Sequence, residues 1–136
     1  MRAFVAGLCL AALAFGASAA RDPLAAQRWR ARILVVSAPS AGDAGLKAQR
    51  AALGPVREGL AERHLVVMEA VGTGPEATAL RKRLRLPPEA FRAVLIGKDG
   101  GAKLVSEEPI PPQTLFATID AMPMRKDEMR TRSSGP

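Results

Sequence analysis

The stretch FRAVLIGKDGGAKLVS, Phe91 to Ser106, decides the fold. Its first half contains the continuous apolar run Ala93 to Ile96, which predicts a strand buried on both faces. Asp99-Gly100 follows, and this dipeptide between two strand-like segments is the strongest short-range signal for a hairpin. The returning strand, Ala102 to Val105, contains Lys103 and is more polar, as an edge strand should be. The sequence therefore predicts an antiparallel hairpin at one edge of a sheet.

Two further apolar runs precede this hairpin. Ile33 to Val36 and Leu65 to Met68 are short and rich in β-branched residues, so both predict buried strands. Between them, apolar residues recur at helical spacing from Ala44 to Arg63. Pro55 lies inside this pattern and predicts a kink or a restart of the helix.

Two more helices complete the pattern. Pro75 stands at the expected start of one, and Pro111-Pro112 start the last, whose apolar stripe runs from Leu115 to Met122. The predicted order is β-α-β-α-β-β-α. Right-handed crossovers would make the first three strands parallel, with the hairpin adding an antiparallel fourth. We therefore expect a thioredoxin-like α/β fold: a single domain with a four-stranded mixed sheet flanked by helices.

The N-terminal stretch MRAFVAGLCLAALAFGASAA has the features of a secretory signal peptide. One basic residue precedes an apolar run that is short for a membrane span, and Ala17-Ser18-Ala19 fits an A-x-A cleavage site. We expect residues 1–20 to be this signal, 21–130 to be the folded domain and 131–136 to be a disordered tail. A periplasmic or secreted protein, with no stable membrane span after cleavage, follows from this interpretation.

Composition narrows the classes of function. Cys9 is the only cysteine, so the chain after residue 20 has no disulfide, no thiol nucleophile and no thiolate metal ligand. Arg2 is the only charged residue among the first 20, which leaves 19 Lys+Arg against 13 Asp+Glu, a net charge of +6. In an exported protein this excess favours an anionic ligand or an envelope protein as partner. Nucleic acid is not expected, because only Trp29, Phe91 and Phe116 could stack on bases.

Three stretches carry a family resemblance. RILVV in the first strand, FRAVLIGKDGGAKLVSEEPI across the hairpin and LFATIDAMPMRKDEM near the end resemble the DUF4174 family of small bacterial exported proteins. The resemblance implies a thioredoxin-like fold and export, and it supplies no activity. Thioredoxins carry a Cys-x-x-Cys pair after the central strand. Here that region reads SAPSAGDAG, Ser37 to Gly45, which excludes thiol-disulfide oxidoreductase activity.

The hairpin and the segment MPMR form the predicted working surface. Its candidate binding residues are Lys98, Asp99, Arg125 and Lys126. Pro123 is expected to end the last helix, with a charged turn or short helix after it. Arg125 could pair with Asp120 and hold the end of this helix to the sheet, through Asp99 or Glu107. Alternatively, it could present its charge to an acidic partner. We expect a non-redox binding or structural module of the bacterial cell envelope.

A second candidate surface is basic. Arg81, Lys82, Arg83 and Arg85 follow one another near the end of a predicted helix. They form a candidate anion patch, and the alternative is a solvated helix face near a C-terminus that favours cations.

Two alternatives belong to other classes of function. Ser37 and Ser40 lie on the predicted loop after the first strand, where α/β proteins bind ligands, so an enzyme could use this loop. Met122 and Met124 are thioethers of the kind that selects Cu(I), although packing explains methionines at a helix end equally well. No catalytic residue, metal ligand or cofactor is assigned from the sequence.

Overall fold

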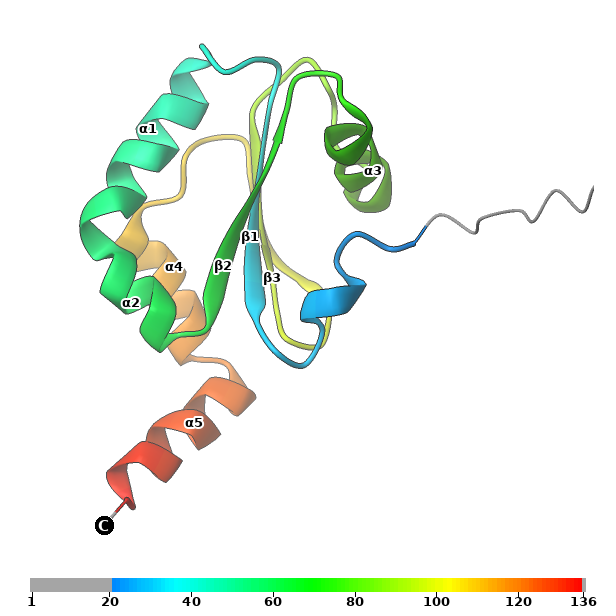
Figure 1. The fold of residues 1–136 in the computed structure, drawn as a ribbon. Coiled ribbons are helices and arrows are strands. Elements are labelled where there is room, and N and C mark those ends of the chain that lie inside the picture. Colours follow the sequence, from blue (N-terminus) through cyan, green and yellow to red (C-terminus); the bar gives the residue numbers. More distant parts are fainter. Residues whose placement is uncertain (1–20, 136) are drawn as a thin grey trace, which may run out of the picture.

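The computed structural model describes residues 21–135, which form an open, mixed four-stranded sheet with helices on both faces (Figure 1). The predicted signal peptide, residues 1–20, lies outside the described residues. The strands are β1 (Arg32–Ala38), β2 (Leu65–Val71), β3 (Arg92–Ile96) and β4 (Ala102–Ser106). Their order in the sheet is β2-β1-β3-β4. Within residues 21–135, no helix is long and apolar enough to cross a membrane.

The direction of β3 corrects the sequence prediction. β1 and β2 are parallel, but β3 runs antiparallel to β1, and β4 antiparallel to β3. Val71 pairs with Ala38, and Arg92 pairs with Ser37, so β3 begins at the end of the sheet where β2 finishes. Arg85, at φ 56, ends the intervening helix in the left-handed conformation that terminates many helices, and the chain re-enters the sheet from the same end.

The second strand also differs from its prediction. β2 is hydrogen-bonded only to β1, so it is an edge strand and not a strand buried on both sides. Val66 and Val67 are 39% and 36% exposed. The other edge is β4, as the polar character of Ala102 to Val105 predicted, and its pairing with β3 is irregular at Leu95 and Ile96.

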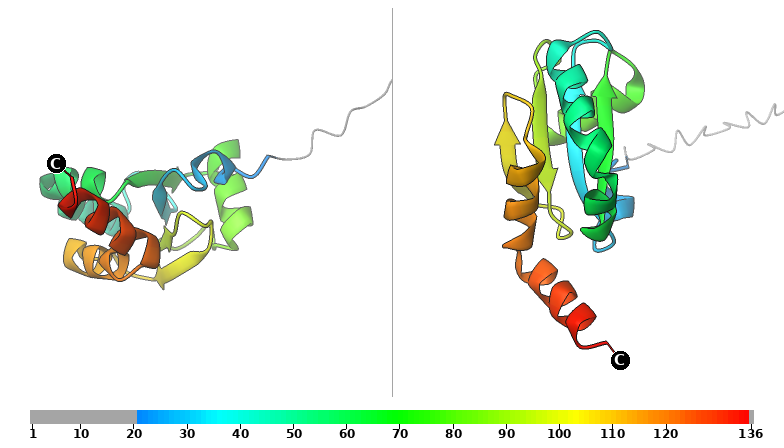
Figure 2. Two further views of the ribbon diagram at one scale, coloured as in Figure 1. Left: turned by 90° about the horizontal axis from the view of Figure 1, so that it is seen from below. Right: turned by 90° about the vertical axis from the view of Figure 1, so that its left-hand side faces the viewer.

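Three helices cover one face of the sheet (Figures 1 and 2). They are α1 (Ala44–Leu53), α2 (Arg57–Glu62) and α4 (Pro112–Asp120). The predicted break at Pro55 is a short 3₁₀ turn, η2 (Gly54–Val56), between α1 and α2. The core beneath these helices is made of inward-facing strand and helix residues, among them Leu34, Val36, Leu46, Leu95, Leu115 and Ile119.

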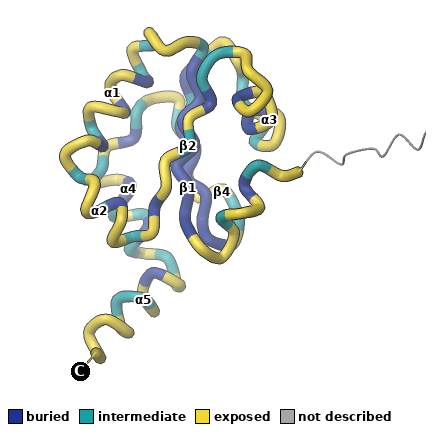
Figure 3. The backbone as a smooth tube through the Cα atoms, in the orientation of Figure 1, coloured by how far each residue is buried: buried dark blue, intermediate teal, exposed yellow. Residues whose placement is uncertain are grey.

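The opposite face is covered by α3 (Pro75–Leu84) and the N-terminal turn η1 (Ala25–Gln27). Its smaller core is made of Leu24, Ile33, Val35, Ala70, Ala77, Leu80, Val94 and Ile96. β1 and β3 supply residues to both cores because successive side chains on a strand point to opposite faces. The central strands are accordingly buried along most of their length, whereas β2 shows exposed residues (Figure 3).

The C-terminal part contains a helix that the sequence did not predict in full. Pro123 does not end the preceding helix, because α4 stops at Asp120 and Pro123 is the first residue of α5 (Pro123–Ser133). Proline suits that position, since the first backbone N–H of a helix needs no partner within the helix. α5 also includes residues 131–133, for which a disordered tail was predicted. It extends from the end of the sheet where β1 begins.

Candidate binding cavity

A cavity of about 320 Å³ lies where the β3–β4 hairpin meets the α4–α5 junction. The hairpin supplies Gly97, Lys98, Asp99 and Lys103, the junction supplies Thr118, Ala121, Met122, Pro123 and Met124, and β1 supplies Arg32. The structure therefore brings together the two segments that the sequence analysis joined into one working surface. The cavity is within the size range of small-ligand sites, and its lining combines apolar side chains with three basic residues and one acidic residue.

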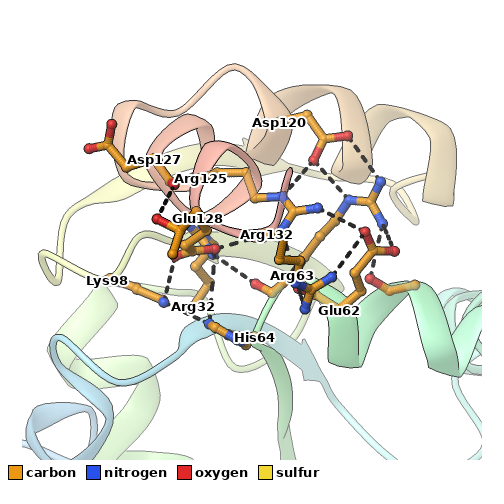
Figure 4. Close-up of polar contacts among 12 residues, drawn as sticks. Arg32, Glu62, Arg63, His64, Lys98, Asp120, Arg125, Asp127, Glu128 and Arg132 are labelled. Atoms are coloured by element: carbon orange, nitrogen blue, oxygen red, sulfur yellow. Dashed lines mark hydrogen bonds and ion pairs between the residues drawn. The ribbon is translucent and has the colours of Figure 1, made fainter. Parts of the chain in front are cut away.

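Arg32 is the least exposed charged residue of the cavity lining. It begins β1, and only 1% of its surface is accessible. Its Nη1 donates to the carbonyl oxygen of Arg63 at 2.8 Å, and Nη1 and Nη2 each donate to the carboxylate of Glu128 at 3.2 Å (Figure 4). Its Nε is buried and has no hydrogen-bond partner among residues 21–135. The guanidinium thus joins β1, the C-terminal end of α2 and α5, while its Nε stays unpaired.

Lys98 forms the second connection to α5. Its Nζ lies 2.6 Å from Oε1 of Glu128 and 2.8 Å from Nδ1 of His64. Burial raises the pKa of Glu128, but the hydrogen bonds from Arg32 and Lys98 outweigh it, and the pKa falls below its usual value. Burial and the charge of Lys98 lower the pKa of His64. The imidazole is therefore a neutral acceptor near pH 7, and the carboxylate is charged.

Arg125 lies on the inward side of α5, and its surface is 2% exposed. Its Nε donates to Asp120 at 3.1 Å and its Nη2 donates to Glu62 at 3.1 Å. Arg63 donates to the same Asp120 carboxylate from α2's C-terminal end, at 3.0 Å. The predicted pair between Arg125 and Asp120 is present, but its further partners are Glu62 and Glu128, and not Asp99 or Glu107. This burial disagrees with the docking role predicted for Arg125.

The other predicted binding residues are divided between the cavity and the open surface. Asp99 lines the cavity, where it accepts a hydrogen bond from Lys103 at 2.8 Å and another from the backbone N–H of Gly101 at 2.9 Å. Both hydrogen bonds lower the pKa of Asp99 below its usual value, and the one from Lys103 has the larger effect. Lys126 is exposed on α5 and is not among the lining residues. Two of the four predicted residues, Lys98 and Asp99, therefore reach the cavity.

The predicted anion patch is not continuous in the structure. Arg81 is buried, and its guanidinium donates to the hydroxyl of Ser37 at 3.0 Å and to the carbonyl oxygens of Ala38 and Ala70 at 2.8 and 3.0 Å. A further bond runs to the carbonyl of Gly72. Arg81 thus satisfies backbone groups at the carboxyl ends of β1 and β2, and four of its five N–H donors are used inside the protein.

The rest of the patch lies on the surface. Arg83 pairs with Asp22 at 3.0 Å, while Lys82 and Arg85 are exposed. The remaining basic surface of α3 is therefore smaller than the sequence suggested.

Residues of the alternative serine and methionine sites lie in a strand or pack against the cores. Ser37 is part of β1 and is buried, so its hydroxyl, already bonded to Arg81, is not presented to a substrate. Met122 packs against the core under α4, whereas Met68 packs against the core under α3. These two thioethers therefore lie on opposite faces of the sheet. Within the described part of the chain, no group of three or more His, Cys, Asp or Glu residues is placed to hold a metal ion.

Residues 23–128 match the model of the domain of unknown function DUF4174. The chain belongs to this family. The match agrees with the resemblance seen in the strand, hairpin and C-terminal motifs. No solved structure matches the chain.

Several proteins similar to this chain come from vertebrates. The chain is 35% identical over 112 residues to the sushi repeat-containing protein SRPX of Rattus norvegicus, covering 72% of this chain and 24% of that protein. It is 30% identical over 115 residues to SRPX2 of Mus musculus, with 74% and 25% covered. The coiled-coil domain-containing protein 80 of Danio rerio is 29% identical over 134 residues, with 79% and 16% covered. The DUF4174 chain thus spans a quarter or less of these relatives.

Sequence reasoning missed Arg32 and Glu128, which link the cavity to α5. The first stands directly before an apolar strand run and looks like a flanking charge. The second belongs to the charged run RKDEM, and the sequence does not show which of these charged residues faces the sheet and which faces solvent. One signal was available: Arg125 and Glu128 are three residues apart and therefore neighbours on a helix face.

Proposed function

We propose that this DUF4174 chain is a non-redox, thioredoxin-like binding module of the bacterial cell envelope. In this proposal, an acidic segment of an envelope protein occupies the cavity between the hairpin and the α4–α5 junction. The observation that carries it is the cavity itself, which two segments distant in sequence build from apolar and basic side chains.

The strand arrangement supports the thioredoxin-like assignment. The order β2-β1-β3-β4, with β3 antiparallel to both of its neighbours and the other strands running in one direction, matches the thioredoxin core. The absence of cysteine after Cys9 supports a non-redox role. The signal-like N-terminal sequence supports placement in the envelope.

The lining favours a ligand that combines an acidic group with an apolar one. Met122, Pro123 and Met124 give an adaptable apolar wall, and methionine accommodates varied shapes. Lys98 and Lys103 also line the cavity. Their ammonium groups pair with Glu128 and Asp99, so an acidic ligand group would share or replace these carboxylates. α5 begins at this cavity with no acidic residue in its first turn and no side-chain cap, so its positive end adds to the attraction.

The enzyme and copper alternatives have less support. An enzyme that uses the loop after β1 would need an accessible nucleophile, and Ser37 is buried and bonded to Arg81. Of the two candidate serines, Ser40 is the one with an exposed position. A copper site at Met122 and Met124 would gain from His64, but Nδ1 of this imidazole already accepts a hydrogen bond from Lys98.

Binding of defined peptides tests the proposal. We would measure fluorescence anisotropy with a panel of short labelled peptides that pair Asp or Glu with an apolar residue. Matched peptides with Asn or Gln in place of the acid are the ligand controls. We expect acidic peptides to bind, and Lys103→Glu to weaken binding about tenfold or more, because like charges across a binding surface cost several kcal/mol.

Two further variants give this test its specificity. Lys47→Glu makes the same change of charge on exposed α1 and should bind as the unmodified protein does. Met124→Ser removes apolar wall without changing charge and should weaken binding as well. Equal affinities for acidic and amide peptides, or equal losses in Lys103→Glu and Lys47→Glu, would overturn the proposal.

A further inference from the structure

The two edges of the sheet differ in how they are protected against pairing with another strand. Natural edge strands are usually guarded by a lysine, a proline or an irregularity in the ladder. β4 has two such features, since Lys103 lies inside it and its ladder with β3 is irregular at Leu95/Ile96. β2, with the sequence LVVMEAV, has neither lysine nor proline over its seven residues.

The outer edge of β2 also has no net charge. Glu69 is its only charged residue, and Arg50 donates to that carboxylate with two hydrogen bonds of 2.6 and 2.7 Å. Val66 and Val67 stay exposed beside it. A neutral, apolar strip on a chain of net charge +7 is the part of the surface where a second basic molecule meets least repulsion.

The backbone of β2 alternates between its partner and solvent. The carbonyl of His64 and the N–H of Gly72 bond to β1, so the even-numbered residues between them direct their backbone groups toward β1. The four odd-numbered residues of β2 direct their N–H and C=O groups outward. These are Leu65, Val67, Glu69 and Val71.

We propose that β2 pairs antiparallel with β2 of a second copy of this chain, around a two-fold axis at Met68. This register sets Val67 against Glu69 and Leu65 against Val71, so all the outward backbone groups of both strands find partners. Each Glu69 then lies diagonal to its counterpart, with an Arg50 bonded to each carboxylate. The strand is thus complementary to itself along its full length.

Neighbouring surface leaves room for the second copy. A hollow of about 600 Å³ follows the same edge and is lined in part by Met68, Ala79 and Leu80. Met68 of one copy lies opposite Met68 of the other, on the α3 face, where the hollow receives it. An isologous contact of this kind closes after two copies. This inference does not depend on the cavity at the α4–α5 junction.

Sedimentation velocity over a range of protein concentrations tests the dimer. We expect a monomer–dimer equilibrium that strengthens when NaCl rises from about 0.05 M to about 0.5 M, since salt screens the repulsion between two basic chains. Val67→Lys should weaken association about tenfold or more. Val105→Lys introduces the same charge at the other edge and should leave association unchanged.

Cysteine cross-linking tests the register, in a Cys9→Ala background that has no other thiol. Met68→Cys places two thiols in a non-hydrogen-bonded antiparallel pair, whose Cα atoms lie about 4.5 Å apart, within the range of a disulfide. We expect Met68→Cys to form disulfide dimers faster than Val105→Cys. A monomer at every concentration, an equal effect of the two lysine variants, or equal cross-linking at the two cysteines would overturn the inference.

Discussion

Three buried arginines join segments that are distant in the sequence. Arg32 links β1 to α5, Arg125 links α5 to α4 and α2, and Arg81 links α3 to the ends of β1 and β2. The planar guanidinium suits this role because it offers five donors in fixed directions. The sequence indicated the pair of Arg125 with Asp120, but it did not indicate the burial of any of the three, since an arginine in a charged run looks the same whether its donors reach carbonyls or water.

Glu128 pairs with three buried cations, and its replacement tests their importance. Glu128→Gln keeps the size of the side chain but leaves Arg32 and Lys98 without their carboxylate. We expect a loss of about 3 kcal/mol in the free energy of unfolding, as for other broken buried pairs. Urea denaturation at pH 7 measures it.

Asp127→Asn is the control for this variant. Asp127 precedes Glu128 on the same helix but pairs with exposed Arg130 on the surface. Exposed pairs contribute little, so its unfolding curve should stay close to that of the unmodified protein. Equal effects of the two variants would show that the buried cluster adds no more than a surface pair.

The same cluster predicts that stability falls in acid. The pKa of His64 is lowered from its ordinary 6.5, so below about pH 6.5 the unfolded chain binds a proton that the folded chain does not. The pKa values of Glu128 and Asp120 are also lowered, and their stabilisation is lost as the pH falls through those folded-state values. Denaturation midpoints should therefore decrease in two stages as the pH falls from about 7.5 to about 2.5, the first below about pH 6.5 and the second below about pH 4.5.

His64→Asn separates the two stages. His64 has φ 48, and asparagine tolerates this left-handed conformation better than most residues. The variant should lose the upper stage and keep the lower one. A midpoint that is constant between about pH 7.5 and 5 in the unmodified protein would contradict the role given to His64.

At the scale of elements, close helix packing depends on Gly59 in α2. A Cβ at this position would lie 2.7 Å from the ring of Phe116 in α4, a distance at which the ring or the helix has to shift. Alanine normally favours a helix over glycine by about 1 kcal/mol. At this position we expect the contact with Phe116 to cost more than alanine gains by favouring the helix.

Gly59→Ala should therefore destabilise the protein by about 1 to 3 kcal/mol, the usual cost of overpacking a core. Thermal and urea unfolding measure the change. Phe116→Leu makes room for the added methyl group, so the double variant should lose less than the sum of the two single variants. Strict additivity would show that the two side chains do not collide.

The helices and strands could largely be predicted, whereas the direction and the position of the strands in the sheet could not. The apolar runs at Ile33 to Val36 and Ala93 to Ile96 are strands, and the break at Pro55 lies where helical spacing and proline chemistry put it. The direction of β3 depends on which end of the sheet the chain re-enters after α3, and local periodicity contains no such information. The edge position of β2 was hidden because Val66 and Val67 are apolar although exposed.

Part of the candidate site could also be predicted. Turn and motif chemistry indicates a surface at the hairpin and the MPMR segment, and Lys98 and Asp99 do line the cavity between them. Arg125 was expected at the surface because charged residues near a helix end are usually solvated. Its burial follows from carboxylates at Glu62 and Asp120, on two other helices.

At the scale of the whole molecule, α5 is attached differently from the other helices. Arg125 is its only buried residue, and ionic contacts to Arg32 and Lys98 hold it beside the sheet. The other long helices each bury two or more residues. Few buried apolar contacts mark a segment that opens locally before the core unfolds.

Native-state hydrogen exchange should reveal this order. We expect the amides of β1 and β3 to exchange most slowly and those of α5 to exchange fastest among the α-helices. Glu128→Gln should accelerate exchange in α5 more than in β1. Equal acceleration in both elements would show that α5 unfolds only together with the sheet.

Arg81 closes the carboxyl ends of β1 and β2, and the cavity lies at the opposite end, where β1 begins. The two regions are separated by the seven residues of β1, about 20 Å of extended chain. This separation gives a fixed place for a spectroscopic label. A fluorophore on Ser40→Cys, in the Cys9→Ala background, would be attached to an exposed residue just past the closed end. Such a label reports on the tumbling of the molecule, which slows when a partner protein of comparable size occupies the cavity, and it does not obstruct that cavity.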